Sequence, residues 1–135
     1  MPQCQESLGL SDFPSWMTEI PSYTFKECNV LRNVSTPSHI MSIGEKAFYD
    51  CSNLVHVKMT SDGNVTTIGD SAFSRCSNPK NISLPDGLTT MGDRAFSQCS
   101  SLERVSLPAG LTTIDDSACY QCYILHGISL PTGLT

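Results

Sequence analysis

The sequence predicts a repeat solenoid, an array of stacked coils in which each coil contributes a short parallel strand. The main observation is one recurring block: "GEKAFYDCSNLVHVKMT", "GDSAFSRCSNPKNISLP", "GDRAFSQCSSLERVSLP" and "DDSACYQCYILHGISLP" begin at residues 44, 69, 92 and 115. A weaker first copy, "PSYTFKECNVLRNVSTP", begins at residue 21. Apolar residues recur at matching positions of the copies, as expected when neighbouring repeats bury a common core.

Four columns of equivalent residues set the period of the array. Each column advances along the chain by 23, 25, 23 and 23 residues. The two additional residues fall in "TSDGNV", residues 60–65, where a turn accommodates an insertion at little cost. The columns are Ile20, Ile43, Ile68, Met91 and Ile114; Phe25, Phe48, Phe73, Phe96 and Cys119; Cys28, Cys51, Cys76, Cys99 and Cys122; and Val34, Val57, Ile82, Val105 and Ile128.

Residues 1–19 are expected to form an N-terminal cap, followed by a solenoid of about five coils over residues 20–135, the last of them incomplete. A terminal repeat exposes apolar surface and needs a cover. Phe13 and Trp16, in the stretch "FPSW", are the residues expected to cover the open side of the first coil.

Each coil is expected to hold a strand in the segment L-x-x-V-x-L. Alternation in the copy that begins at residue 92 directs Val105 and Leu107 towards the core and Arg104 and Ser106 towards solvent. A proline follows this segment in the last three copies and is expected to end the strand without interrupting it.

The second half of the coil reads L-T-T-I-G-D-x-A-F-x-x-C. The stretches "LTTMG" and "LTTID" favour β structure and predict a second, shorter strand. Asp70, Asp93 and Asp116 stand where an N-cap would stand, so one helical turn is expected over "SAFSRC" and "RAFSQC". The convex side of the coils is accordingly expected to be either a helical turn or irregular. Phe96 and Cys99 are three residues apart and are expected to point inward together.

The blocks "IGDSAFSRCSNPKNISLP" and "MGDRAFSQCSSLERVSLP" resemble the BspA-like, cysteine-containing class of leucine-rich repeat over residues 20–135. The A-F-x-x-C step distinguishes this class from ordinary leucine-rich repeats. The resemblance implies a right-handed solenoid that binds a protein or extracellular-matrix-type ligand in adhesion or recognition. It also implies a secreted or cell-surface location, and it implies no catalytic site.

The cysteine column is expected to form an internal row of thiols. Equivalent sulfurs of adjacent coils would lie about 5 Å apart, too far for an S–S bond of about 2.05 Å. Free cysteine packs as a small hydrophobic residue. Buried, reduced thiols are therefore predicted at Cys28, Cys51, Cys76, Cys99 and Cys122, and no role is predicted for Cys4.

An alternative function is a thiol redox or metal protein that uses Cys119 and Cys122, because "CYQC" matches C-x-x-C. The repeat offers a simpler explanation, in which Cys119 replaces the phenylalanine of its column. Such a replacement is expected to leave the last coil underpacked at a cost of a few kcal/mol.

A second alternative is an ice-binding solenoid, in which stacked threonines order water. The candidate pairs are Thr66 and Thr67, Thr89 and Thr90, and Thr112 and Thr113, with one side chain of each pair expected to turn inward. The simpler explanation is that threonine favours β structure.

The outward side of the strand array is the predicted ligand-binding surface, because rigid rows of side chains at fixed spacing suit an extended partner. A merely solvated face is the simpler explanation for its serine-rich rows. The candidate residues are Asn33, Ser35, His56, Lys58, Asn81, Ser83, Arg104, Ser106, His126 and Ser129.

Catalysis, cofactors and metals are not expected. His56 and His126 occupy outward positions, away from thiols that are expected to be buried, so a Cys/His nucleophile pair is not predicted. The net charge of -5 comes without a cluster of Lys and Arg, which argues against nucleic-acid binding. No apolar run is long enough for membrane insertion.

The two ends of the sequence give two further expectations. The N-terminus lacks the basic and apolar regions of a secretory signal, so either a cytosolic protein or a missing upstream piece is expected. The chain stops within a repeat at "LPTGLT". Its last coil is therefore expected to meet a partner, a continuation or a second copy, which would associate end to end.

Overall fold

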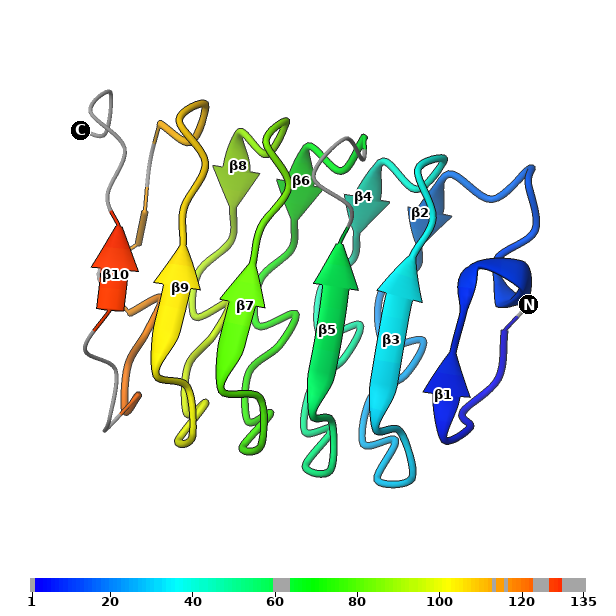
Figure 1. Ribbon diagram of the computed structural model, residues 1–135, viewed down its shortest axis with the longest axis horizontal. Coiled ribbons are helices and arrows are strands. Elements are labelled where there is room, and N and C mark those ends of the chain that lie inside the picture. The colour runs from blue at the N-terminus through cyan, green and yellow to red at the C-terminus, as the bar shows by residue number, and fades with distance from the viewer. Residues whose placement is uncertain (1, 60–63, 113, 116, 123–126, 130–135) are drawn as a thin grey trace.

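A computed structural model describes residues 2–59, 64–112, 114, 115, 117–122 and 127–129 of the chain. Two parallel sheets run along the molecule, the larger in front and the smaller behind it, as Figure 1 shows. The six-stranded sheet has the order β1-β3-β5-β7-β9-β10 and the four-stranded sheet the order β2-β4-β6-β8. The strands are β1 (Ser7–Leu8), β2 (Glu19–Ile20), β3 (Asn33–Thr36), β4 (Ser42–Ile43), β5 (His56–Met59), β6 (Thr67–Ile68), β7 (Asn81–Ser83), β8 (Thr90–Met91), β9 (Arg104–Ser106) and β10 (Gly127–Ser129).

Strand pairing confirms the predicted stack of parallel strands. Asn33 pairs with His56 and Val34 with Val57 across β3 and β5, so the register joins equivalent residues of successive coils. The same register joins Ile82 to Val105 across β7 and β9. The predicted second strands are present as β4, β6 and β8, although each has only two residues.

The phenylalanine column forms the centre of the core. Phe25, Phe48, Phe73 and Phe96 are all buried, and their rings stack with centroids 5.3, 5.1 and 5.6 Å apart. The interplanar angles of 17, 5 and 12° show that the rings lie nearly parallel. Offset stacking of this kind adds stabilisation beyond the apolar area that the rings bury.

Of the two forms expected for the convex side, the irregular one is observed: "SAFSRC" and "RAFSQC" form turns with left-handed residues, and the helical turn over them is not present. In the first, φ is 57° at Ser71 and 65° at Arg75; in the second, it is 60° at Arg94 and 61° at Gln98. An α-helix requires φ near −63° at every position. We call the equivalent stretches, residues 21–28, 44–51, 69–76, 92–99 and 115–122, the turn segments.

Hydrogen bonds between coils explain this conformation. The left-handed Ser71 and Arg75 direct their backbone N–H groups to the next coil, to the carbonyls of Asp93 at 2.9 Å and Ser97 at 2.8 Å. The intervening Phe73 N–H donates to Ala95 at 2.9 Å. A non-glycine residue in the left-handed region costs about 1–2 kcal/mol. Backbone hydrogen bonds between adjacent coils offset this cost in the turn segments. A helix could not form them, because its backbone hydrogen bonds stay within the segment.

The predicted N-cap role of the aspartates is also corrected. The Asp70 carboxylate accepts the Asp93 backbone N–H at 2.9 Å, which is a bond to the next coil rather than to its own turn. Asp116 lies outside the described residues.

Glycine at the start of a turn segment allows the coils to approach closely. A Cβ added to Gly69 would lie 2.6 Å from the Glu45 backbone nitrogen of the preceding coil. Because the obstacle is backbone rather than a flexible side chain, any larger residue would push the two coils apart.

The N-terminal segment folds onto the first coil. Phe13 is buried, as predicted for a cap, but Trp16 is 71% exposed and does not cover the coil. Buried Met17 packs in the core there. Strand β1 extends the large sheet by pairing with β3, and the short 3-10 helix η1 (Leu10–Asp12) follows it.

The cysteine row is buried and hydrogen-bonded between coils. The Sγ–H groups of Cys51, Cys76 and Cys99 donate to the carbonyls of Phe25, Phe48 and Phe73 in the preceding coil, at 3.1, 3.1 and 3.2 Å. These three side chains have no measurable exposure. A small side chain that is also a weak donor therefore satisfies a carbonyl inside the core.

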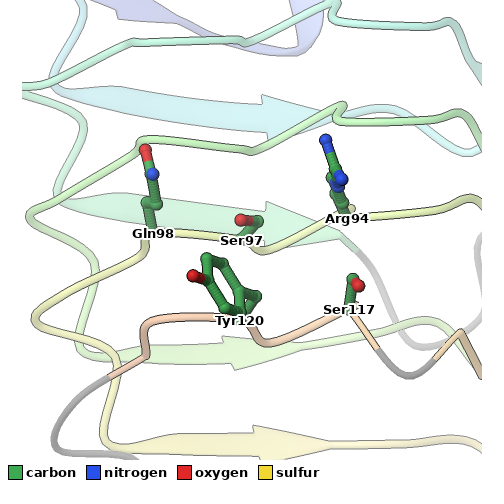
Figure 2. A pocket seen from close by; sticks show the side chains of 5 residues that line it. All are labelled: Arg94, Ser97, Gln98, Ser117 and Tyr120. Carbon is green, nitrogen blue, oxygen red and sulfur yellow. The ribbon is translucent and has the colours of Figure 1, made fainter.

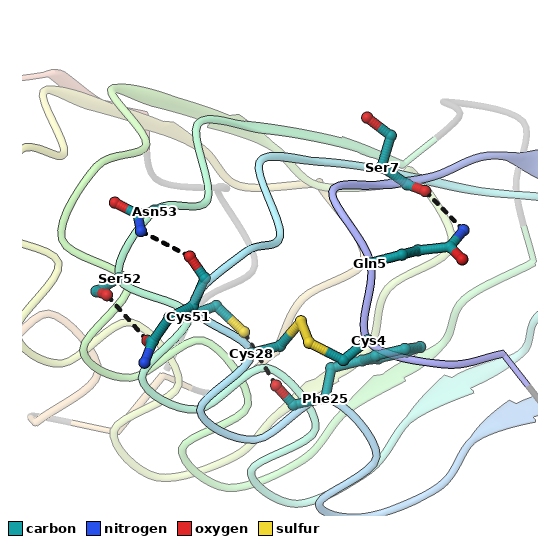
Figure 3. The surroundings of a disulfide bond; sticks show 9 residues. Cys4, Gln5, Ser7, Phe25, Cys28, Cys51, Ser52 and Asn53 are labelled. Carbon is teal, nitrogen blue, oxygen red and sulfur yellow. Dashed lines mark hydrogen bonds between the residues drawn. A yellow bond between two sulfur atoms is a disulfide. The ribbon is translucent and has the colours of Figure 1, made fainter.

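The prediction of a reduced Cys28 is wrong. Cys28 forms a disulfide with Cys4, with Cα atoms 5.7 Å apart, as Figure 3 shows. The spacing of the coils excludes bonds within the column, but Cys4 lies outside it and approaches from the N-terminal segment. Cys28 is the first cysteine of the row, so no preceding phenylalanine carbonyl is available to it. The disulfide occupies the place that this hydrogen bond takes in later coils.

The last described coil is less tightly packed than the others. The ring stack ends at Phe96, because Cys119 stands at the next aromatic position. Cys119 and Cys122 are only partly buried. Cys122 still donates to the Phe96 carbonyl at 3.1 Å, so the row of thiol bonds continues into this coil.

The thiols differ in pKa because their surroundings differ. Burial raises the pKa of Cys99 to about 12 and raises the pKa of Cys76 well above the ordinary thiol value. A hydrogen bond with Cys122 lowers the pKa of Cys119, and the same bond raises the pKa of Cys122. Since the thiolate is the reactive form, Cys119 is the thiol best suited to react.

Replacing Cys4 with Ser is expected to lower the free energy of unfolding by about 3 kcal/mol, because the disulfide closes a loop in the unfolded chain. Urea denaturation of the oxidised wild type and the variant measures this difference. Reductant should destabilise the wild type by a similar amount and leave Cys4→Ser unchanged. A wild-type midpoint that is the same with and without reductant would contradict the disulfide.

Alkylation of the native protein at pH 8 is expected to modify Cys119 first and to spare Cys76 and Cys99. Mass spectrometry of peptides taken over a time course gives the order. In denaturant without reductant five thiols should react, the number outside the disulfide. Early modification of Cys99 in the native protein would show that the row is not sealed from solvent.

Candidate functional site

The outward side chains of β3, β5, β7 and β9 form a continuous surface, which we call the strand face. Its first row places Asn33 beside His56 and Asn81 beside Arg104. Backbone hydrogen bonds on both sides of each inner strand fix the spacing of these side chains. The surface is therefore rigid before any ligand arrives, which lowers the entropic cost of binding.

The second row lies parallel to the first. Ser35 pairs with Lys58, Lys58 with Ser83, and Ser83 with Ser106. Of the eight predicted residues in the two rows, Asn33 and Ser35 are half-buried and the other six are exposed. Asn33 donates its side-chain amide to the Ser7 hydroxyl of β1 at 3.1 Å, so β1 begins the row.

Two of the predicted residues cannot be placed on this surface. His126 lies outside the described residues. Ser129 pairs with Ser106 at the backbone of β10, but its side chain is not described.

Basic residues concentrate along the strand face of an otherwise acidic chain. Lys58 and Arg104 are on the strands, and Arg32 and Lys80 are exposed one residue before β3 and β7. These are four of the eight Lys and Arg residues of the chain. The strands β3, β5, β7 and β9 contain no Asp or Glu. Two acidic residues adjoin this group: Glu6, whose carboxylate lies 3.8 Å from the Arg32 guanidinium, and Glu103, which directly precedes Arg104.

Arg32 and Lys80 were not among the predicted site residues. The signal that could have found them is their position, since both directly precede the first outward residue of a strand. The predicted rows consist of alternating positions inside each strand, and this alternation does not extend to the residue before the strand.

The threonine rows differ from their prediction. In the pairs Thr66–Thr67 and Thr89–Thr90, three side chains are exposed and Thr67 is half-buried. No side chain of either pair therefore turns inward. The inward positions belong to Val65 and Leu88, which precede the pairs. The Thr89 hydroxyl donates to the Thr66 carbonyl at 3.2 Å, and the Thr66 hydroxyl to the Met41 carbonyl at 3.4 Å. Hydroxyls held by backbone carbonyls are poorly disposed to order water. Thr113 lies outside the described residues.

The pair of Cys119 and Cys122 occupies one turn segment. The Cys122 thiol is held by the Phe96 carbonyl, as in the other coils, so its position follows from the repeat. Among the described residues, no group of three or more His, Cys, Asp or Glu side chains is arranged to hold a metal ion. His39, the third histidine, has its Nε2 atom 3.1 Å from the Phe13 carbonyl and helps to tie the N-terminal segment to the solenoid.

In the parts of the chain that the structure covers, no helix has the length and apolar character needed to cross a membrane.

Three solved structures are similar to this one. A leucine-rich cell surface protein from Faecalibacterium prausnitzii is 31% identical over 94% of this chain and 32% of its own, with a TM-score of 0.84. The T. pallidum leucine-rich-repeat protein is 26% identical over 85% of this chain and 64% of its own, with a TM-score of 0.65. The pneumococcal vaccine antigen PcpA is 20% identical over 92% of this chain and 30% of its own, with a TM-score of 0.78, and shares the fold.

The chain thus spans about a third of the length of the first of these proteins. A comparison with curated proteins finds no match. The family model for the BspA-type leucine-rich-repeat region matches residues 6–135 in six copies. Together with the stacked coils and their A-F-x-x-C turn segments, this match shows that the chain belongs to the BspA-type leucine-rich-repeat family.

Proposed function

We propose that the protein is a non-enzymatic adhesion module that uses its strand face to bind an extended, acidic segment of a partner protein. Leucine-rich-repeat proteins generally bind proteins, which supports the general class. The observation that carries the proposal is the concentration of Lys58, Arg104, Arg32 and Lys80 on a rigid surface of an acidic protein. A partner with carboxylates at a matching spacing would be attracted to this surface and repelled by much of the remainder.

A location outside the cell is part of the proposal. The Cys4–Cys28 disulfide supports it, because disulfides persist in oxidising compartments. A related structure, at 31% identity, is that of a leucine-rich cell surface protein, which also supports it. Cys51, Cys76 and Cys99 are compatible with such a compartment, since they are buried in the core and protected from exchange.

End-to-end association through the last coil is a further part of the sequence-based hypothesis. This expectation falls on the last coil, of which residues 123–126 and 130–135 lie outside the described part of the chain. The redox and ice-binding alternatives gain no support from the arrangement of Cys119 and Cys122 or from the threonine rows.

Reversing two charges on the strand face, with Lys58→Glu and Arg104→Glu together, is expected to weaken binding to immobilised extracellular-matrix proteins at least tenfold. The reason is that both side chains are exposed on the strand face, on β5 and β9 with only β7 between them, and face the proposed partner. Biolayer interferometry against a panel of such proteins measures the effect. Wild-type binding should also weaken as salt rises, because the contacts are exposed charges.

The matched control compares two variants that lower the net charge by the same amount: Arg104→Glu on the strand face, and Thr18→Glu with Thr90→Glu beside the four-stranded sheet, where both threonines are exposed. The threonine variant should retain most of the wild-type affinity, whereas Arg104→Glu should lose part of it. Equal losses in both variants would show that net charge alone governs binding. Failure of the wild type to bind any protein of the panel would contradict an adhesive role.

A further inference from the structure

Two adjoining pockets, each of about 250 Å³, lie along the turn segments. They share Arg94, Ser97 and Gln98, and we call the continuous hollow the turn notch. Tyr49 lines the pocket at one end and Tyr120 lines the pocket at the other. These tyrosines are three coils apart, a distance of about 14 Å at about 4.8 Å per coil.

The notch exists because of one column of the repeat. The position after the phenylalanine holds Tyr49 and Tyr120 in two coils and Ser74 and Ser97 in the two coils between them. Two small residues between two large ones leave a hollow whose floor is serine and whose ends are aromatic. In Figure 2, Ser97 lies between Arg94 and Gln98, with the ring of Tyr120 beside it on the next coil.

The serines of the floor are buried polar groups without a protein partner. Ser74 is 6% exposed and Ser97 is 4% exposed. Within the part of the chain that the structure describes, neither hydroxyl makes a hydrogen bond, although both line the notch. Buried hydroxyls are normally paired, so two unpaired ones facing the same hollow indicate that a ligand or water completes them.

The tyrosine at one end is held in place by cations. The Lys26 and Lys46 ammonium groups lie 6.0 and 5.7 Å from the centre of the Tyr49 ring, and the Arg75 guanidinium lies 5.9 Å from it. Arg75 also donates to the Tyr49 hydroxyl at 3.4 Å. This bond and the nearby Asp50 carboxylate raise the pKa of Arg75. The ring is thus fixed before a ligand arrives.

The notch is basic, and some of its cationic side chains are available to bind an anionic ligand. None of its described lining residues is acidic, whereas Lys46, Arg75 and Arg94 all contribute to it. Across the described residues, neither Lys46 nor Arg94 takes part in an ion pair. The neighbouring Asp70 carboxylate is engaged by the Asp93 N–H. Gln98 is oriented by a 2.8 Å bond from its Nε2 atom to the Gln121 Oε1 atom.

Backbone groups of the notch are not available to a peptide. The N–H groups of Asp50, Ser71, Arg75 and Gln98 all donate to carbonyls of the next coil, at 2.6–2.9 Å. A peptide strand therefore finds these four donors already engaged. Recognition in the notch has to use hydroxyls, an amide, cations and aromatic rings, and this combination suits a ring that carries hydroxyls and a carboxylate.

We propose that the turn notch is a binding site for an acidic oligosaccharide. Tyr49 and Tyr120 pack against sugar rings, the Ser74 and Ser97 hydroxyls and the Gln98 amide bond sugar hydroxyls, and Arg94 and Lys46 bind carboxylates. All of these residues belong to the turn segments, and none belongs to the six-stranded sheet. The site is therefore separate from the strand face, and either can fail without the other.

Isothermal titration calorimetry with trigalacturonate tests the proposal. The wild type is expected to bind one molecule with a dissociation constant of about 1 mM or tighter. Arg94→Ala should weaken binding about tenfold, and methyl-esterified trigalacturonate, which lacks the charges, should bind at least tenfold more weakly to the wild type. The variant Ser97→Tyr should abolish binding because it fills the notch. Tyrosine occurs at the same position in two other coils, so this variant is expected to fold, and a thermal unfolding curve like that of the wild type checks it.

Arg104→Ala, on the strand face, is the control and should bind trigalacturonate as the wild type does. Full affinity in Ser97→Tyr, or no binding by the wild type, would overturn the proposal. Triglutamate bound as tightly as trigalacturonate would also overturn it, because the notch would then recognise negative charge rather than a sugar. Loss of matrix-protein binding in Lys58→Glu/Arg104→Glu with trigalacturonate affinity unchanged would show that the two sites are independent.

Discussion

Backbone hydrogen bonds between successive coils are the constraint on which the remaining structure depends. They hold each residue directly beside its equivalent one coil later, as Val34 lies beside Val57 and Phe73 beside Phe96. Any property of one repeat position therefore becomes a row that runs along the molecule. The stacked phenylalanines and the thiol row are both rows of this kind.

The same constraint explains how a single substitution creates a surface feature. Where all coils share a residue type, the row is uniform and contributes to the core. Where coils differ, as Ser74 and Ser97 differ from Tyr49 and Tyr120, the difference appears as a hollow with defined ends. The solenoid thus carries its variable chemistry at positions whose backbone is held by neighbours on both sides, which is why the side chains there are well positioned to recognise a ligand.

Sequence reasoning was sufficient where the repeat itself holds the information. The period located the strands, the inward columns and the buried cysteines from Cys51 to Cys99, because each depends only on equivalent positions lying together. It was not sufficient for the turn segments. Phe96 and Cys99 point inward at a three-residue spacing that fits a helix, but a turn with left-handed residues directs their side chains in the same way. The two conformations differ in the hydrogen-bond partners of their backbone N–H groups, which lie in the next coil and are not visible in the spacing.

The repeat period also does not predict features that lie outside the repeat. The pairing of Cys4 with Cys28 depends on how the N-terminal segment folds back, and no column contains Cys4. Trp16 was expected to cover the first coil on the basis of its size, yet Phe13 and Met17 take the inward positions. The turn notch is present because two serines are smaller than the tyrosines at the equivalent positions of the flanking coils. Serine is not a chemically distinctive residue, so the sequence alone does not draw attention to this position.

The disulfide between Cys4 and Cys28 has a mechanical consequence for a protein that holds two bodies together. The residues between the two cysteines cannot be drawn out into extended chain while the bond remains, so the first coil resists tension along the chain. The coil that contains Cys119 and Cys122 has neither a disulfide nor a phenylalanine in the ring stack. Under load that coil is therefore expected to lengthen before the first coil does.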